Sequence, residues 1–111
     1  MKPTIFVDVT NQMTIAREEI FGPVLCVIPY KTDDEAIAIA NDSPYGLAGY
    51  VSSENRQRAK HIADQLDTGM VSINTFVHTP FAPFGGTRQS GLGRENGMYG
   101  IGAYLEYKTI A

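Results

Sequence analysis

The sequence predicts an α/β fold in which short parallel strands alternate with helices. Apolar runs of strand-like periodicity alternate along the chain with segments of helical periodicity. Parallel strands need a crossover connection, so this alternation favours parallel pairing with right-handed crossovers. The strand-like runs are residues 4–9, 24–30, 47–52 and 70–74, and the helical segments are residues 33–41 and 54–66.

The first strand is predicted from alternation, because Ile5, Val7 and Val9 recur with a period of two residues. Met13–Glu19 is expected to form a short helical turn that brings an acidic pair to a Gly-Pro break. The next run, Val24–Tyr30, is almost continuously apolar, which is typical of a strand covered on both faces.

Two longer helices follow in the predicted order. Asp33 and Asp34 place negative charge in the first turn of one helix, where the helix dipole favours it, and Pro44 ends that helix. The other helix carries an apolar stripe at positions i, i+3, i+4 and i+7, formed by Ala59, Ile62, Ala63 and Leu66. We expect Gly69 to end it in the left-handed conformation, and Tyr45-Gly46 to be a simple connector.

The C-terminal part of the chain lacks this regularity. From Thr75 to about Gly97 there is little periodicity, and so long an irregular loop is commonly functional. Met98–Tyr104 is predicted to be a short helix. Leu105–Ile110 is predicted to be a terminal strand, whose free edges are candidates for pairing with another chain.

Composition excludes several classes of function. A chain of 111 residues is long enough for one small domain. The net charge of −3 and the absence of a basic run argue against nucleic-acid binding, and the apolar runs, all under ten residues, predict no membrane span. The N-terminus does not resemble a signal peptide, and a single cysteine fits a reducing compartment, so we expect a cytoplasmic protein.

The glycine-rich block at residues 85–97 does not match a nucleotide-binding motif. Gly91, Gly93 and Gly97 have G-x-G-x-x-x-G spacing rather than the dinucleotide fingerprint, and no strand leads into them. We interpret these glycines as allowing tight turns and close packing. Cys26 lies within an apolar run and is predicted to be buried and inert, while His61 is predicted to be solvated. No histidine or carboxylate cluster predicts a metal site or a catalytic triad.

Glu19 and Phe21 stand just before the Gly22-Pro23 break, at the predicted lip of a strand. A carboxylate there can accept hydrogen bonds from two vicinal ribose hydroxyls, and an aromatic side chain two residues on can cover a flat ring. On local chemistry alone, an exposed acidic pair before a buried strand is the favoured interpretation.

Four sequence blocks favour a ligand-binding role for Glu19 and Phe21 over that interpretation: EEIFGPVL, NDSPYGLAGYV, GMVSIN and PFGGTRQSGLGRENG. In this order and spacing, the chain from Lys2 onwards resembles the C-terminal portion of the NAD(P)-dependent aldehyde dehydrogenase superfamily. The resemblance implies a fragment of a three-layer α/β/α parallel sheet. Residues 1–111 would be a single partial domain, part of the catalytic domain, ending in an oligomerisation strand at about residues 105–111.

By this resemblance, Glu19 would bond the nicotinamide ribose hydroxyls and Phe21 would contact the nicotinamide end of NAD or NADP. Glu18 matches no such contact and is expected at the surface. The residues expected near the aldehyde are Phe76, Val77, His78 and Thr79, which would line its tunnel, and Phe84, for which simple packing is the alternative role. No catalytic residue is predicted, because the family's nucleophilic cysteine lies in a segment N-terminal to anything present here. No metal ligand is predicted either.

The family reaction oxidises an aldehyde to a carboxylic acid. We expect this chain to be inactive alone and to bind NAD or NADP weakly or not at all, because one or two contacts cannot offset the costs of binding a dinucleotide. Two alternatives remain: a non-catalytic oligomerising α/β module, which would be a homo-oligomer, and an independent nucleotide-binding protein. The sequence names neither the aldehyde nor the choice between NAD and NADP.

Overall fold

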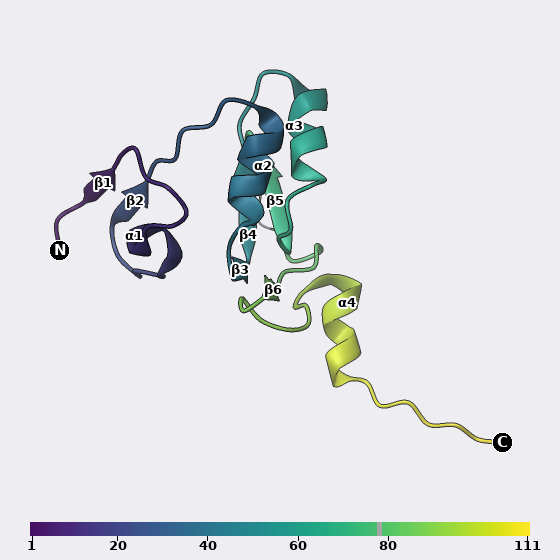
Figure 1. The fold of residues 1–111 in the computed structure, drawn as a ribbon. Helices are drawn as coiled ribbons and strands as arrows, with labels where there is room; N and C mark the ends of the chain where they lie inside the picture. Colours follow the sequence, from purple (N-terminus) through teal and green to yellow (C-terminus); the bar gives the residue numbers. More distant parts are fainter. Residues whose placement is uncertain (78) are drawn as a thin grey trace. The chain divides into compact units, whose positions relative to one another are not determined.

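A computed structural model describes residues 1–77 and 79–111, and within it the chain divides into two compact units. The N-terminal unit comprises Met1–Ser43, and the C-terminal unit comprises Pro44–Ala111 (Figure 1). Each unit contains a pair of short parallel strands and short helices, as the sequence predicts.

The N-terminal unit contains two strands and two helices in alternation. They are β1 (Thr4–Phe6), α1 (Thr14–Arg17), β2 (Val24–Cys26) and α2 (Asp33–Asn41). β1 and β2 pair in parallel, with Thr4 opposite Val24 and Phe6 opposite Cys26. The helical turn expected over Met13–Glu19 is confirmed as α1.

The expectation of a strand covered on both faces over Val24–Tyr30 is wrong. β2 ends at Cys26, and the Leu25 side chain is 57% exposed. A two-stranded sheet with one four-residue helix in its connection has too few side chains to cover both faces.

Helix α2 begins where the acidic residues predicted it would. Its N-cap residue Thr32 accepts a hydrogen bond through Oγ1 from the Glu35 backbone N–H at 3.2 Å. The Glu35 carboxylate in turn accepts a hydrogen bond from the Lys31 N–H at 2.7 Å. Ile37 on this helix and Val9 between β1 and α1 are the buried hydrophobic residues of the described N-terminal unit.

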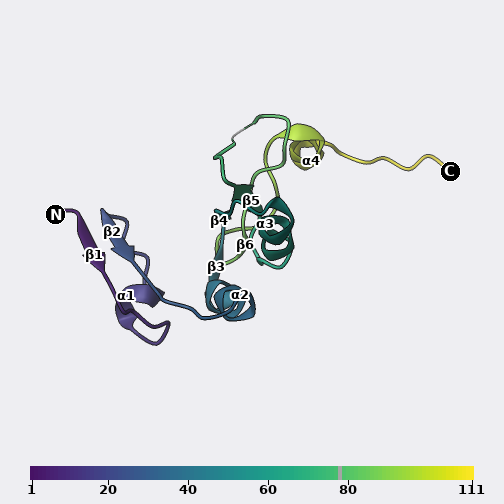
Figure 2. The same ribbon diagram turned by 90° about the horizontal axis from the view of Figure 1, so that it is seen from above.

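The C-terminal unit contains a parallel strand pair covered by one helix. Its elements are β3 (Tyr45–Gly46), β4 (Ala48–Val51), α3 (Arg56–Ala63), β5 (Met70–Ile73), β6 (Thr87–Arg88), α4 (Gly97–Ile101) and the 3₁₀ helix η1 (Gly102–Tyr104). β4 pairs in parallel with β5, and α3 lies against both strands (Figure 2). The predicted helix stripe is confirmed for three of its residues, since Ala59 is completely buried and Ile62 and Ala63 are half-buried; α3 ends at Ala63, so half-buried Leu66 lies beyond the helix.

Two predictions about this unit are wrong. Tyr45-Gly46 is strand β3, which pairs antiparallel with β6 inside the stretch expected to be irregular. Gly69 has no positive φ. Glycine is required there because a Cβ atom would lie 1.6 Å from the carbonyl oxygen of Gly85. Both features depend on contacts between residues distant in sequence, which local periodicity does not reveal.

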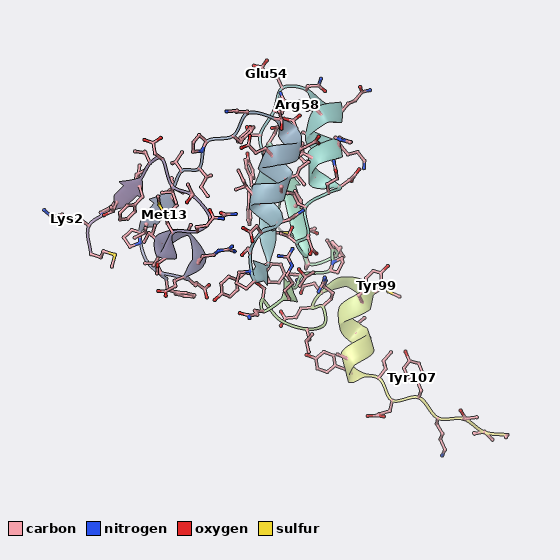
Figure 3. All side chains as sticks on the ribbon, in the orientation of Figure 1. Lys2, Met13, Glu54, Arg58, Tyr99 and Tyr107 are labelled. Carbon is pink, nitrogen blue, oxygen red and sulfur yellow. The ribbon has the colours of Figure 1, made fainter. Side chains whose placement is uncertain are left out.

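The last residues of the chain follow α4 and η1, which confirm the helix predicted over Met98–Tyr104. Residues 105–111 have no regular structure, and their side chains are exposed. Tyr99 and Tyr107, labelled in Figure 3, are 74% and 90% exposed. Pairing of this terminal segment with another chain stays a prediction.

Candidate functional site

The turn between α1 and β2 carries Glu19 and Phe21. α1 ends at Arg17, and Glu18 continues as extended backbone with its N–H donating to the Thr14 carbonyl at 3.0 Å. Phe21 has a φ of 53°, in the left-handed region that residues other than glycine rarely adopt. Such backbone costs on the order of 1–3 kcal/mol and tends to occur at ligand-binding turns. Phe21 is 94% exposed.

Glu19 and Phe21 border one hollow of about 450 Å³ in the N-terminal unit. Its other lining residues are Ile15, Ala16, Glu18, Ile20, Gly22, Val24, Cys26 and Ile28. Among the described residues, the exposed Glu19 carboxylate has no hydrogen-bond or ion-pair partner. The hollow therefore combines apolar and polar lining with an acceptor group at its rim that is available to a ligand.

Cys26 is half-buried on the wall of this hollow, so the expectation of a fully buried thiol is wrong. One side of β2 opens onto the hollow instead of onto a second packing layer. The Cys26 thiol lies 3.5 Å from the Ile15 carbonyl oxygen, to which it donates. In this arrangement the thiol links α1 to β2.

The cluster of Asn11, Arg17 and Asp42, here called the Asp42 clasp, was not predicted. Arg17 donates through Nη1 to the Asp42 carbonyl at 2.8 Å and through Nη2 to both carboxylate oxygens at 3.0 and 2.9 Å. Asn11 donates to the Ile39 carbonyl at 2.9 Å and to the Asp42 carboxylate at 3.1 Å. The hydrogen bond from Arg17, and then that from Asn11, holds the pKa of Asp42 below its ordinary value. No local pattern indicates this pairing, because Arg17 and Asp42 are 25 positions apart.

The residues expected in an aldehyde tunnel lie in the C-terminal unit, after β5. Phe76 and Val77 are exposed, and Thr79 is half-buried with its Oγ1 accepting from the Phe81 N–H at 3.3 Å. His78 lies outside the described residues. Phe84 is held by a backbone bridge to Glu95, with N–H to O distances of 2.8 and 2.7 Å.

The glycine-rich block forms tight turns around the Arg94 guanidinium. Arg94 Nη1 donates to the carbonyls of Gly86 and Gly93, both at 2.7 Å. Gly91, Gly93 and Gly97 all have positive φ. The block borders a separate hollow of about 840 Å³ within the C-terminal unit, with Phe84 and Tyr104 also on its wall. The tight turns predicted for these glycines are confirmed, and close packing is confirmed at Gly97, where a Cβ atom would lie 2.6 Å from the Phe81 carbonyl oxygen, but not at Gly91 or Gly93, which have open space around them.

Two further properties bear on the class of protein. Within residues 1–77 and 79–111, no three His, Cys, Asp or Glu residues gather as metal ligands. Nor does any helix in this part of the chain have the length and apolar character needed to cross a membrane.

Comparison with known proteins shows which family shares the sequence of this chain. The model of the aldehyde dehydrogenase family matches residues 1–110. This chain belongs to the aldehyde dehydrogenase family. A Staphylococcus aureus protein named as an aldehyde dehydrogenase is 56% identical over 110 residues, which make up 99% of this chain and 23% of that relative.

Solved aldehyde dehydrogenase structures share the fold. The Mycobacterium tuberculosis aldehyde dehydrogenase complexed with NAD⁺ matches with a TM-score of 0.89 and 54% identity, over 92% of this chain and 21% of that one. A variant of Pseudomonas syringae aldehyde dehydrogenase C, complexed with NAD⁺ and octanal, matches with a TM-score of 0.90 and 51% identity, over 94% of this chain and 21% of that one. The predicted family and fold class are confirmed, and the chain spans between a fifth and a quarter of its relatives' length.

Proposed function

We propose that this chain forms one wall of the cofactor and aldehyde site of an NAD(P)-dependent aldehyde dehydrogenase, and that the 111-residue chain alone does not oxidise aldehydes. The observation that carries the proposal is the shared hollow of Glu19 and Phe21. Family membership and the NAD⁺ complexes of similar structures support it.

The groups at this hollow fit the nicotinamide end of a dinucleotide. The unpaired Glu19 carboxylate accepts hydrogen bonds, as two vicinal ribose hydroxyls require. The exposed Phe21 ring and the apolar side chains of the lining, such as Ile15, Ile20 and Val24, would keep water from one side of a flat heterocycle. When bound, NAD or NADP supplies the hydride acceptor. The role of this chain is then to orient the ribose and to shield one face of the ring.

Weak cofactor binding is expected when the free energy of the available hydrogen bonds is compared with the cost of association. Hydrogen bonds to a charged group contribute roughly 1.5–3 kcal/mol each, so two would contribute roughly 3–6 kcal/mol. Association costs about 4–15 kcal/mol in lost translational and rotational freedom, before any side chain is ordered. Glu19 and Phe21 therefore orient a cofactor that other parts of an aldehyde dehydrogenase bind.

Absence of activity follows from the surroundings of the chain's one thiol. Cys26 donates to the Ile15 carbonyl, and no base contacts its sulfur among the described residues. We assign it no catalytic role. The aldehyde contacts proposed here are Phe76, Val77, His78, Thr79 and Phe84. The exposure of the apolar residues Phe76 and Val77, shortly after β5, supports the proposal.

An NADH-formation assay tests the proposal. The purified chain is incubated with NAD⁺ or NADP⁺ and a panel of aliphatic and aromatic aldehydes, with an intact family enzyme as the positive control. We expect no turnover above the rate of a Cys26→Ala variant. Turnover by the unmodified chain that this variant lacks would overturn the assignment of Cys26 and the claim of inactivity together.

A second candidate function is a non-catalytic oligomerising module. The observation that favours it is a series of exposed large apolar side chains near the C-terminus: Met98, Tyr99, Ile101, Tyr104, Leu105, Tyr107 and Ile110. Large exposed apolar patches usually mark interaction surfaces. We propose homo-oligomerisation through residues 105–111, and a light-scattering mass equal to one chain would exclude it.

The single cysteine supports a cytoplasmic location, which fractionation of the producing cells would test.

A further inference from the structure

Helix α1, which leads directly into Glu19, is too short to be stable by itself. It has four residues, and its N-cap residue Met13, labelled in Figure 3, makes no capping hydrogen bond through its side chain. Isolated helices shorter than about 12–15 residues are marginal in water. Tertiary contacts must therefore hold this turn, and with it the segment that carries Glu19.

One set of contacts comes from the Asp42 clasp. Arg17, the last residue of α1, contacts both the carbonyl and the carboxylate of Asp42, the residue that caps α2. A planar guanidinium that is hydrogen-bonded to both a carbonyl and a carboxylate has little freedom to rotate, whereas the charged groups of most surface ion pairs share a single contact. Asn11 adds a hydrogen bond to the same carboxylate. The end of α1 is thus fastened to the end of α2.

A second set comes from the β1–β2 pair. The Cys26 thiol contacts the Ile15 carbonyl of α1, and the Thr4 N–H donates to the Pro23 carbonyl at 3.0 Å. Pro23 directly follows the Phe21-Gly22 turn. Residues 18–22 are therefore held before the turn by α1 and its clasp, and after it by the sheet.

We propose that Arg17 and Asp42 are positioning residues for Glu19: the clasp holds α1 in place, and α1 holds the carboxylate at the rim of the hollow. The inference rests on the cofactor-binding role proposed above. Arg17 precedes Glu19 by two positions, and the intervening Glu18 is bonded to α1 through its own N–H. Opening the clasp lets α1 fray, so that Glu19 must be reordered at an entropic cost whenever a ligand binds.

The test measures backbone order in the ¹⁵N-labelled full chain by heteronuclear NOE, which reports picosecond-to-nanosecond motion. In the unmodified chain we expect residues 14–22 to be as ordered as α2. Arg17→Met is expected to lower the NOE values of residues 14–22 while β1 and β2 keep theirs, and Arg17→Lys is expected to restore part of the loss. Asp42→Asn, a smaller change, should act in the same direction.

Lys60→Met is the matched control, because it breaks an exposed ion pair with Asp64 in the other unit. It should leave residues 14–22 unchanged. Unchanged order in both Arg17→Met and Asp42→Asn would overturn the proposal. A uniform loss across β1, β2 and α2 would overturn it too, since the clasp would then hold the whole unit and have no particular role for Glu19.

Titration of the same samples with nicotinamide mononucleotide separates this inference from the proposed function. If the mononucleotide shifts the Glu19 amide and Arg17→Met leaves the order of residues 14–22 unchanged, the positioning role fails while the cofactor role stands. If Arg17→Met loosens these residues and the mononucleotide shifts no amide of the unmodified chain, the cofactor role fails while the positioning of Glu19 by the clasp stands.

Discussion

Asn74 joins the chain segments that follow β4 and β5 through two hydrogen bonds of one side chain. Its Nδ2 donates to the Ser53 carbonyl, and its Oδ1 accepts from the Ser53 N–H, both at 2.8 Å. Its φ is 59°, a left-handed conformation that asparagine tolerates better than most residues. The segment proposed to contact the aldehyde begins two residues later, so this link also fixes where that segment starts.

We expect Asn74→Ala to destabilise the C-terminal unit by about 2–4 kcal/mol. Two lost hydrogen bonds contribute about 0.5–1.5 kcal/mol each, and the left-handed backbone adds roughly 1 kcal/mol for alanine. Because Asn74 is exposed, water replaces part of the lost hydrogen bonding, and the lower end of the range is expected. Asn74→Gly is the matched control: it loses the same bonds but bears no left-handed penalty.

Urea unfolding followed by circular dichroism measures both variants against the unmodified chain, with the slope m checked for constancy. Asn74→Gly should be more stable than Asn74→Ala by roughly 1 kcal/mol, and both should be less stable than the parent. Equal stability of all three proteins would refute the reasoning. Equal losses in the two variants would show that the backbone conformation contributes nothing.

Further outcomes follow from individual contacts. Gly69→Ala should destabilise by about 3 kcal/mol or more, measured by the same unfolding assay, because the new methyl group would overlap the Gly85 carbonyl. Thr32→Ala should cost about 1 kcal/mol through loss of the α2 cap, seen as a lower urea midpoint. Phe21→Gly should raise stability by roughly 1 kcal/mol by relieving positive φ, yet weaken any response to nicotinamide mononucleotide in an NMR titration. The pKa of Asp42 is lowered in the folded chain, so its carboxylate contributes stability that is fully present at pH values above the unfolded-state pKa, about 4. This stability is lost as the pH falls through the folded-state pKa. The melting temperatures of the unmodified chain and Asp42→Asn should therefore converge at acid pH.

Local patterns predicted the parts of the fold that depend on neighbouring residues. The buried and half-buried residues Ala59, Ile62 and Ala63 of α3 and the acidic first turn of α2 each lie within a single helix, and both helices form within the predicted segments. The parallel strands β4 and β5 lie within the predicted apolar runs for the same reason. β3 and β6 are separated by β4, α3, β5 and the first part of the long loop, so no short window of sequence contains both.

The sequence predicts which residues form the candidate site, but not their backbone conformation or the contacts that hold them. The place of Glu19 and Phe21 before a Gly-Pro break, together with the family resemblance, predicts them as site residues. The left-handed backbone at Phe21 had no sequence signal, since the following glycine was the natural candidate for that conformation. The sequence does not predict the Asp42 clasp either, because two ordinary surface charges 25 positions apart indicate no contact.

The central claim is that Glu19 and Phe21 form a wall for the nicotinamide ribose. The most direct measurement is amide chemical-shift mapping of the ¹⁵N-labelled chain during titration with NAD⁺, repeated with Glu19→Gln. The account predicts weak binding that shifts the amides of residues 18–22 and is reduced in the variant. Shifts confined to residues outside the hollow, or an unchanged response in Glu19→Gln, would contradict it.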